Sequence, residues 1–136
     1  MRLFLSLALL WAALGAHAAQ WVENGADTQA RYYVDMDSIQ VDGDTVRVAK
    51  RGVFTQPMTE ELGGRPTPFK ETLGLVELDC GRRINRVIQI DMIGPEGNVA
   101  WSSGRMQKRL WEDVQTNTHG EATLDFVCGA LGKSSK

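Results

Sequence analysis

The fold of this 136-residue chain depends on one stretch, Glu71-Thr72-Leu73-Gly74-Leu75-Val76-Glu77-Leu78-Asp79-Cys80. Successive side chains point to opposite faces of a strand, so Val76, Leu78 and Cys80 share one face. The alternation predicts a strand over residues 71–79. Its inner face places the first cysteine in line with apolar neighbours.

Further strands are expected on both sides of this stretch. Aromatic and β-branched residues favour strands, and Asp42-Gly43 between two alternating segments is a strong hairpin signal, because glycine accepts the positive φ of the turn. Gly94-Pro95-Glu96-Gly97 has the composition of a second turn. The additional expected strands are residues 31–35, 39–41, 45–54, 84–93 and 98–102.

Residues 55–69 have a different composition. They contain Pro57, Pro66, Pro68 and the pair Gly63-Gly64, which predicts a long surface loop. Long loops without structure of their own are often functional. We therefore expect the partner-binding surface over residues 55–70.

A helix is expected near the C-terminus. Thr118 and Glu121 have the spacing of a capping box, in which each side chain accepts a hydrogen bond from a backbone N–H. Gly132 is a suitable stop. The apolar face of this helix follows the i, i+3, i+4, i+7 pattern and consists of Leu124, Val127, Cys128 and Leu131.

Cys80 and Cys128 are the two cysteines of the chain. Both fall on the apolar faces of their elements, by two independent periodicities, and both follow an export signal, so we expect one disulfide between them. In the chain-entropy description such a bridge stabilises the fold by about 4 kcal/mol. Two free thiols and an intermolecular bridge are the alternatives.

The N-terminus has the pattern of a signal peptide over residues 1–18. Met1-Arg2 is followed by a mostly apolar run over 3–14 and by Gly15-Ala16-His17-Ala18, which places cleavage after Ala18 or one residue later. An uncleaved anchor is the alternative. With no cysteine near the cut we expect no lipid anchor, and no other segment is apolar enough to cross a bilayer. Residues 19–136 then form one domain that is periplasmic or secreted to the cell surface.

The composition argues against several activities. A net charge of −2 gives no reason to expect nucleic-acid binding. No metal-ligand set, phosphate-binding glycine loop or nucleophile motif is present, so we expect no metal, no cofactor and no enzyme. His119 reads as a solvated residue of a helix start. An acidic group with a partial calcium-loop pattern reads as a turn and a hairpin tip; it comprises Asp35, Asp37, Asp42 and Asp44.

Two further groups have two interpretations each. The basic residues form either a site for an acidic partner or an ordinary solvated surface, and we favour the solvated surface. The aromatic residues are either interface anchors or part of the core, and we favour the core. The basic residues are Arg82, Arg83, Arg86, Arg105, Lys108 and Arg109. The aromatic residues are Trp21, Tyr32, Tyr33, Trp101 and Trp111.

Several short motifs, taken in order, resemble the surface-adhesin protein E family over nearly the whole chain after the signal. A final threonine segment departs from the family pattern, since Thr116 replaces a proline while Thr118 keeps the hydroxyl. The matching motifs are Tyr33-Val34-Asp35-Met36-Asp37-Ser38-Ile39, Val46-Arg47-Val48, Glu77-Leu78-Asp79-Cys80 with Arg82-Arg83, Trp111 with Val114, and Val127-Cys128.

The resemblance agrees with the fold expected from the residues. That fold is a single small α+β domain, an antiparallel sheet of about five to six strands packed against a C-terminal helix and tied by one disulfide. It also implies a function: an exported, non-enzymatic binding protein of a Gram-negative bacterium that engages host matrix or serum proteins. The alternative is a soluble periplasmic protein of envelope upkeep that binds a bacterial partner.

Overall fold

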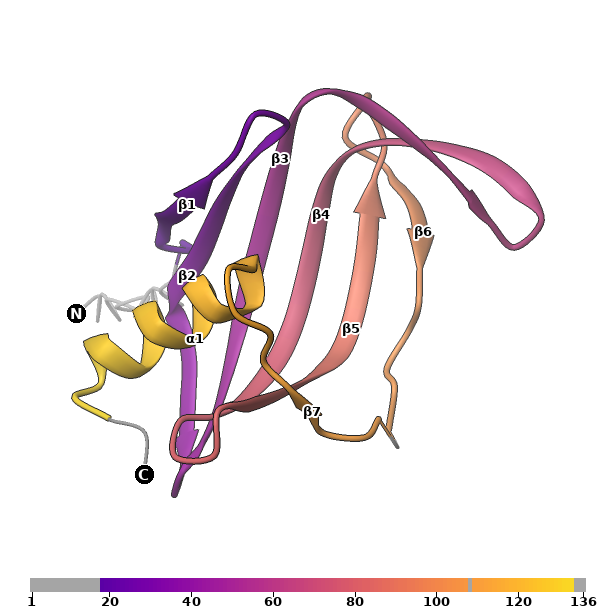
Figure 1. Ribbon diagram of the computed structural model, residues 1–136. Coiled ribbons are helices and arrows are strands. Elements are labelled where there is room, and N and C mark those ends of the chain that lie inside the picture. The colour runs from indigo at the N-terminus through magenta and orange to yellow at the C-terminus, as the bar shows by residue number, and fades with distance from the viewer. Residues whose placement is uncertain (1–17, 108, 134–136) are drawn as a thin grey trace, which may run out of the picture.

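The computed structural model describes residues 18–107 and 109–133, and the predicted signal peptide falls on residues 1–17 outside them and on Ala18. The described chain is mostly strands, with one helix near its end (Figure 1). The elements are β1 (Trp21–Ala26), β2 (Ala30–Asp42), β3 (Thr45–Leu62), β4 (Arg65–Asp79), β5 (Ile84–Ile93), β6 (Val99–Ser102), β7 (Glu112–Asp113) and α1 (His119–Ala130).

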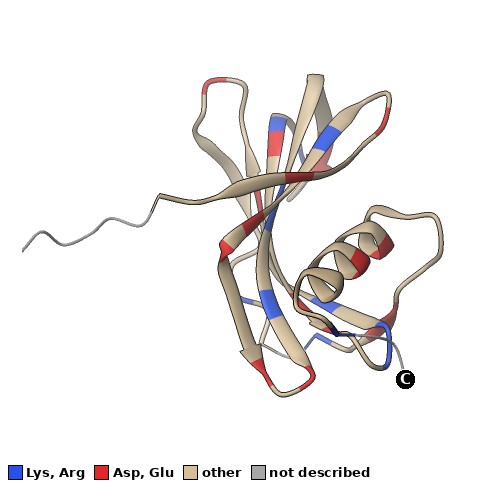
Figure 2. Cartoon of the chain, turned by 90° about the vertical axis from the view of Figure 1, so that its left-hand side faces the viewer, with Lys and Arg blue, Asp and Glu red and all other residues tan. Residues whose placement is uncertain are grey.

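The strands form one antiparallel sheet in the order β1-β2-β3-β4-β5-β6, and the short β7 pairs with β5. Each strand up to β6 therefore lies beside its neighbour in sequence. The sheet curves around α1, which lies across one of its faces (Figure 2). The predicted antiparallel sheet with a C-terminal helix is confirmed. Strands β1 and β7 were not predicted from the sequence, and β2, whose register with β3 is irregular between Asp35 and Gln40, was expected as two strands.

The core lies between α1 and the centre of the sheet. The expected alternation is confirmed: Val46 and Val48 are fully buried, whereas Arg47 and Arg51 face the other side and pair with acidic residues of β4. Helix residues at i, i+3 and i+4 complete the cluster, which consists of Val34, Val46, Val48, Val76, Leu78, Cys80, Leu124, Val127 and Cys128.

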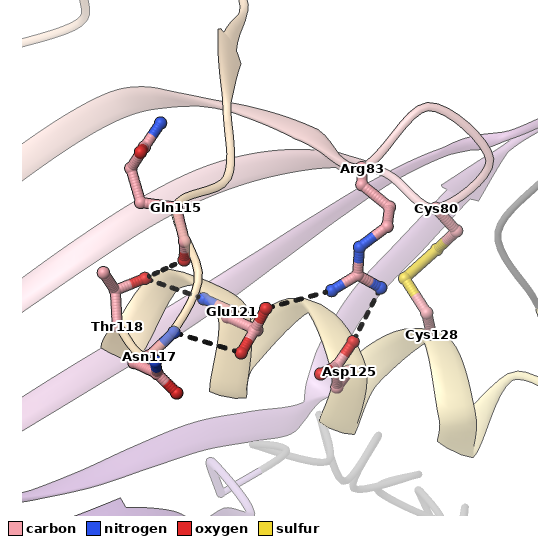
Figure 3. Close-up of polar contacts among 8 residues, drawn as sticks. All are labelled: Cys80, Arg83, Gln115, Asn117, Thr118, Glu121, Asp125 and Cys128. Atoms are coloured by element: carbon pink, nitrogen blue, oxygen red, sulfur yellow. Dashed lines mark hydrogen bonds and ion pairs between the residues drawn. A yellow bond between two sulfur atoms is a disulfide. The ribbon is translucent and has the colours of Figure 1, made fainter.

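A disulfide and two ion pairs hold α1 against the end of β4 (Figure 3). Cys80 directly follows β4 and bonds to Cys128 of α1, with their Cα atoms 5.8 Å apart. Nearby, the Arg83 guanidinium lies 2.8 Å from Asp125 and 3.5 Å from Glu121. The covalent and ionic contacts therefore join the same two parts of the chain.

The start of α1 is capped much as the sequence predicts. Thr118 is the N-cap residue, and its Oγ1 accepts a hydrogen bond from the backbone N–H of Glu121 at 3.2 Å. The Glu121 carboxylate accepts in return from the N–H of Asn117, one residue before the cap (Figure 3). At the other end Gly132 has φ +66°, the left-handed conformation in which glycine ends helices.

The prediction of a surface loop over residues 55–69 is wrong. Met58 to Leu62 pair with Arg65 to Phe69, so that β3 and β4 continue as a two-stranded hairpin beyond the rest of the sheet. Gly63 and Gly64 form the two-residue turn with φ of +59° and +75°, the conformation of a type I′ hairpin turn. Residues 56–70 are called the arm below. Figure 1 shows the arm projecting past β6.

Candidate binding surface

Helix α1 covers only part of the inner face of the sheet (Figure 1). The uncovered part of this face, beyond the start of the helix, carries a groove. The groove has a volume of about 230 Å³. It is called the sheet groove below and is lined by Tyr32, Lys50, Arg51, Gly52, Thr72, Leu73, Gly74, Val76, Val87, Ile90 and Met92. Most of the side chains that the register places on this face are apolar.

Two glycines create the space on this face. A Cβ on Gly52 would lie 2.9 Å from Thr72 Oγ1, closer than real Cβ atoms approach a neighbour, and in ordinary contact with the Tyr32 ring at 3.4 Å. A Cβ on Gly74 would lie 3.2 Å from Cγ of Lys50, the residue opposite it in β3. Gly52 therefore leaves room for Thr72 and Tyr32, and Gly74 leaves room for the Lys50 side chain.

Lys50 is the one lysine or arginine whose side chain the register places on the wall of the sheet groove. It continues the inward alternation of Val46 and Val48 and is half-buried. Burial lowers the pKa of its ammonium group, because a charge loses solvation in apolar surroundings. No oxygen of the described residues lies within hydrogen-bond or ion-pair distance of this ammonium. Lys50 was not among the site residues predicted from the sequence, although a lysine at an inward strand position is a signal that indicates such a site.

A polar cluster lies between the groove and the start of α1. The His119 ring contacts that of Tyr32, with centroids 3.6 Å apart, and its Nε2 lies 3.0 Å from Asp27 Oδ2. Hydrogen bonds from the backbone of Gln29 and Ala30, opposed by desolvation and aided by His119 and Tyr32, lower the pKa of Asp27. His119 lies at the start of α1 with 42% of its side chain exposed, which confirms the prediction of a solvated position, and its ring in addition ties the helix to the β1–β2 turn.

The arm has two unequal edges. Pro66 and Pro68 lie opposite Glu61 and Thr59 in the register. Positions along an antiparallel pair alternate between hydrogen-bonded and non-hydrogen-bonded. Pro66 and Pro68 have no N–H to donate, so they occupy non-hydrogen-bonded positions. Their nitrogens therefore face the outer edge of β4, away from β3. That edge lacks two donors.

The outer edge of β3 in the arm is open. Thr59 and Glu61 stand opposite the prolines, so their own N–H and C=O groups point away from β4. The pairing of β3 with β2 ends at Phe54, and no described strand pairs with the β3 edge beyond it. The β4 edge instead faces the β5–β6 turn across a cavity of about 460 Å³. The arm thus offers one free edge.

The outer face of the sheet carries ion pairs. Glu77 is buried and accepts from Arg47 at 2.7 Å and from Arg86 at 2.9 Å. Burial raises the pKa of the Glu77 carboxyl, but the hydrogen bonds and charges of the two arginines outweigh it, so the pKa lies below its usual value. Trp111 stacks on Arg86, 4.7 Å from its ring centroid to the guanidinium carbon.

The basic residues of the sequence do not gather into one patch. Arg82 pairs with Asp79, Arg83 with the helix and Arg86 with Glu77, while Arg105 and Arg109 are exposed and Lys108 lies outside the described residues. Figure 2 shows both signs of charge spread over the described fold. This arrangement agrees with an ordinary solvated surface rather than a site for an acidic partner.

The aromatic and acidic residues also have definite places. The five aromatic residues Trp21, Tyr32, Tyr33, Trp101 and Trp111 are half-buried and lie outside the buried core cluster, so the preference for core is wrong. The Asp35 carboxylate accepts backbone hydrogen bonds from Gln20 and Asp37. Asp42 ends β2, and Asp44 lies in the two-residue turn between β2 and β3. Within residues 18–107 and 109–133 no group of three or more His, Cys, Asp or Glu could hold a metal ion.

These features define a class of small proteins, in which a curved antiparallel sheet carries one C-terminal helix clamped by a disulfide. The family model of surface-adhesin protein E matches residues 21–129. The chain belongs to this family, which confirms the resemblance read from the sequence. A search of curated proteins found no match.

Solved structures of Haemophilus influenzae protein E share the fold. The crystal form II structure is 13% identical, with a TM-score of 0.57 over 85% of this chain and 99% of that chain. A second structure is 12% identical, with a TM-score of 0.54 over 82% and 96%. The protein E from non-typeable Haemophilus influenzae is 13% identical, with a TM-score of 0.53 over 85% and 88%. At these identities the likeness concerns the fold.

Proposed function

We propose that this chain is an exported, non-enzymatic adhesin that binds another protein through the arm, with host matrix or serum proteins as its partners. Membership of the surface-adhesin family supports an adhesive role and argues against an enzyme. Among the described residues no helix is long and apolar enough to span a bilayer. The open β3 edge of the arm carries the proposal.

The arm fits strand addition by a partner. An extended peptide can pair with a free sheet edge, where backbone hydrogen bonds give affinity and side-chain contacts give specificity. Thr59 and Glu61 supply such an edge, and the prolines of the opposite edge prevent pairing there. Charged residues at positions 60 and 61 limit self-association through the same edge.

Shortening the arm tests its role without disturbing the core. Met58 pairs with Phe69 in a hydrogen-bonded position, so Asn-Gly in place of residues 59–68 closes a shorter hairpin with a favourable turn. We expect unchanged thermal unfolding of the sheet and loss of binding to immobilised matrix extract and serum. Unchanged binding would remove the arm from the proposal.

The edge itself is tested by a matched pair of variants. Glu61→Pro removes one outward N–H and leaves the internal hydrogen bonds of the hairpin intact, whereas Glu61→Ala removes only the side chain. Strand addition predicts weaker binding for the proline variant and near-normal binding for the alanine variant. Equal losses in both would point to side-chain recognition instead.

Location separates this proposal from the alternative of a periplasmic protein of envelope upkeep. Protease treatment of intact cells, followed by fractionation, shows whether the protein is displayed outside. An adhesin is cleaved in intact cells. Complete protection until the outer membrane is opened would favour the periplasmic role and a bacterial partner.

A further inference from the structure

Lys50 places an ammonium group without an acidic partner on the wall of the sheet groove, among residues that are mainly apolar. A charge in such a place costs solvation energy unless something compensates it. The Lys50 stem also occupies the space left by Gly74, so its path along the sheet is fixed by the register of β3 and β4. We therefore expect the Lys50 ammonium to bind an anionic group that does not belong to the described residues.

The rest of the groove determines what can carry that anion. Backbone N–H and C=O groups of β3, β4 and β5 are used in the ladders of the sheet, so its face offers few hydrogen bonds to a ligand. Thr72 and Tyr32 supply the hydroxyls, and that of Tyr32 already lies 3.3 Å from Asp27. A peptide laid on this face would leave its own amide groups unsatisfied. A hydrocarbon chain has no such groups.

The size of the groove limits the ligand further. Its volume is about 230 Å³, against about 150 Å³ for a cavity that holds benzene and roughly 300–1,000 Å³ for a site that holds a drug-sized ligand. One short alkyl chain fits this range. Met92 and Ile90 line the groove, and the flexible thioether can adapt to chains of different shape.

The geometry points to a binding site for a medium-chain fatty acid, with the carboxylate on the Lys50 ammonium and the alkyl chain along Val87, Ile90 and Met92. The lowered pKa of Lys50 agrees with this site. Burial deprives the ammonium of solvating water, and the negative charge of a bound carboxylate compensates for that loss. This inference goes beyond adhesion by the arm and does not depend on it, because the groove and the open β3 edge are separate surfaces.

Titration of the full-length mature protein with octanoate, followed by calorimetry and by amide chemical shifts, tests the site. Octan-1-ol keeps the chain and lacks the charge, octylammonium reverses the charge, and acetate lacks the chain. We expect saturable octanoate binding with shifts confined to the groove strands, and at least about tenfold weaker binding of each control ligand. Equal binding of octanoate and octylammonium would overturn the assignment, as would shifts elsewhere or no saturable binding.

Variants assign the charge to one residue. Lys50→Met keeps most of the bulk and removes the ammonium, Lys50→Arg keeps a cation, and Lys70→Met changes an exposed lysine of β4 in the arm. We expect about a tenfold loss for Lys50→Met, at most about a threefold loss for Lys50→Arg, and no change for Lys70→Met. Octanoate binding that is equal in Lys50→Met and wild type contradicts the proposal.

Folding is checked in the same samples. Lys50→Met removes a charge that burial disfavours, so its melting temperature should equal or exceed that of the wild type. A loss of binding in a variant with a normal melting temperature then reports on the site. Were the variant to unfold, the comparison of octanoate with octan-1-ol on the wild-type protein would still decide the matter.

Discussion

The carboxylate of Glu77 lies 2.7 Å from the guanidinium of Arg47 and joins β4 to β3 across the outer face of the sheet. The register places these two residues directly opposite each other, and Arg86 approaches the other carboxylate oxygen from β5. One buried acid thus links three consecutive strands. The buried Glu77 carboxylate is shielded from solvent, so its contribution to stability depends on its contacts with both arginines.

Glu77→Gln should lower the free energy of unfolding by about 1–3 kcal/mol, since it leaves the two guanidinium groups with a neutral partner. Glu71→Gln is the matched control. Its partner Arg51 lies 2.9 Å away in a pair that is more exposed than Glu77, so its loss should cost at most about 1 kcal/mol. Urea denaturation at neutral pH measures both. Equal costs would show that burial of Glu77 has no energetic consequence.

The Glu77 contribution should also depend on pH. Its pKa is lowered in the folded protein, so its stabilisation is complete above the pKa of the unfolded chain, about 4.3, and is lost as pH falls through the folded value. The difference between wild type and Glu77→Gln should therefore shrink in urea denaturations below about pH 4. A difference that stays constant throughout acid titration contradicts the assigned charge state.

Removing the disulfide through Cys80→Ala with Cys128→Ala should destabilise the fold strongly. The bridge closes a loop with a sequence separation of 48, for which the chain-entropy description gives about 4 kcal/mol. A domain of this kind has a net stability of about 5–15 kcal/mol, so the loss is a large share. Thermal unfolding with and without reductant measures it.

Reductant supplies the control for that experiment. It should lower the melting temperature of the wild type and leave that of the double variant unchanged, and thiol titration of the unfolded, unreduced protein should find none. A wild-type curve that reductant does not move would mean that the bridge adds nothing to stability.

The central strands and the helix could be predicted because their signals are local. Alternation put Val76, Leu78 and Cys80 on one face, and the i, i+3, i+4 pattern put Cys128 on the helix face that meets them. In these elements the residues that form the periodic apolar face are the residues that are buried. The disulfide partners therefore met where two independent patterns placed them.

The arm and the groove could not be predicted in this way. Pro66 and Pro68 count against a strand in composition, but they are compatible with an edge whose nitrogens face outward, and only the register with Glu61 and Thr59 reveals that. The groove depends on Lys50 standing opposite Gly74, two residues that are 24 positions apart in sequence. Such cross-strand pairs become visible once the sheet is assembled.

Thr118→Ala should weaken the start of α1 by about 1 kcal/mol, the usual cost of removing an N-cap hydroxyl. The hydroxyl accepts from the Glu121 N–H, and without it this amide has no intrahelical acceptor. Thr118→Ser keeps the oxygen and should change stability by a few tenths of a kcal/mol at most.

Hydrogen exchange at the Glu121 amide, measured together with the melting temperature, distinguishes a local effect of Thr118→Ala from a global one. Faster exchange in the alanine variant and wild-type exchange in the serine variant are expected, because the cap acts on the first turn while the disulfide still holds the last turn to the sheet. Identical exchange in all three proteins would show that solvent replaces the cap without cost.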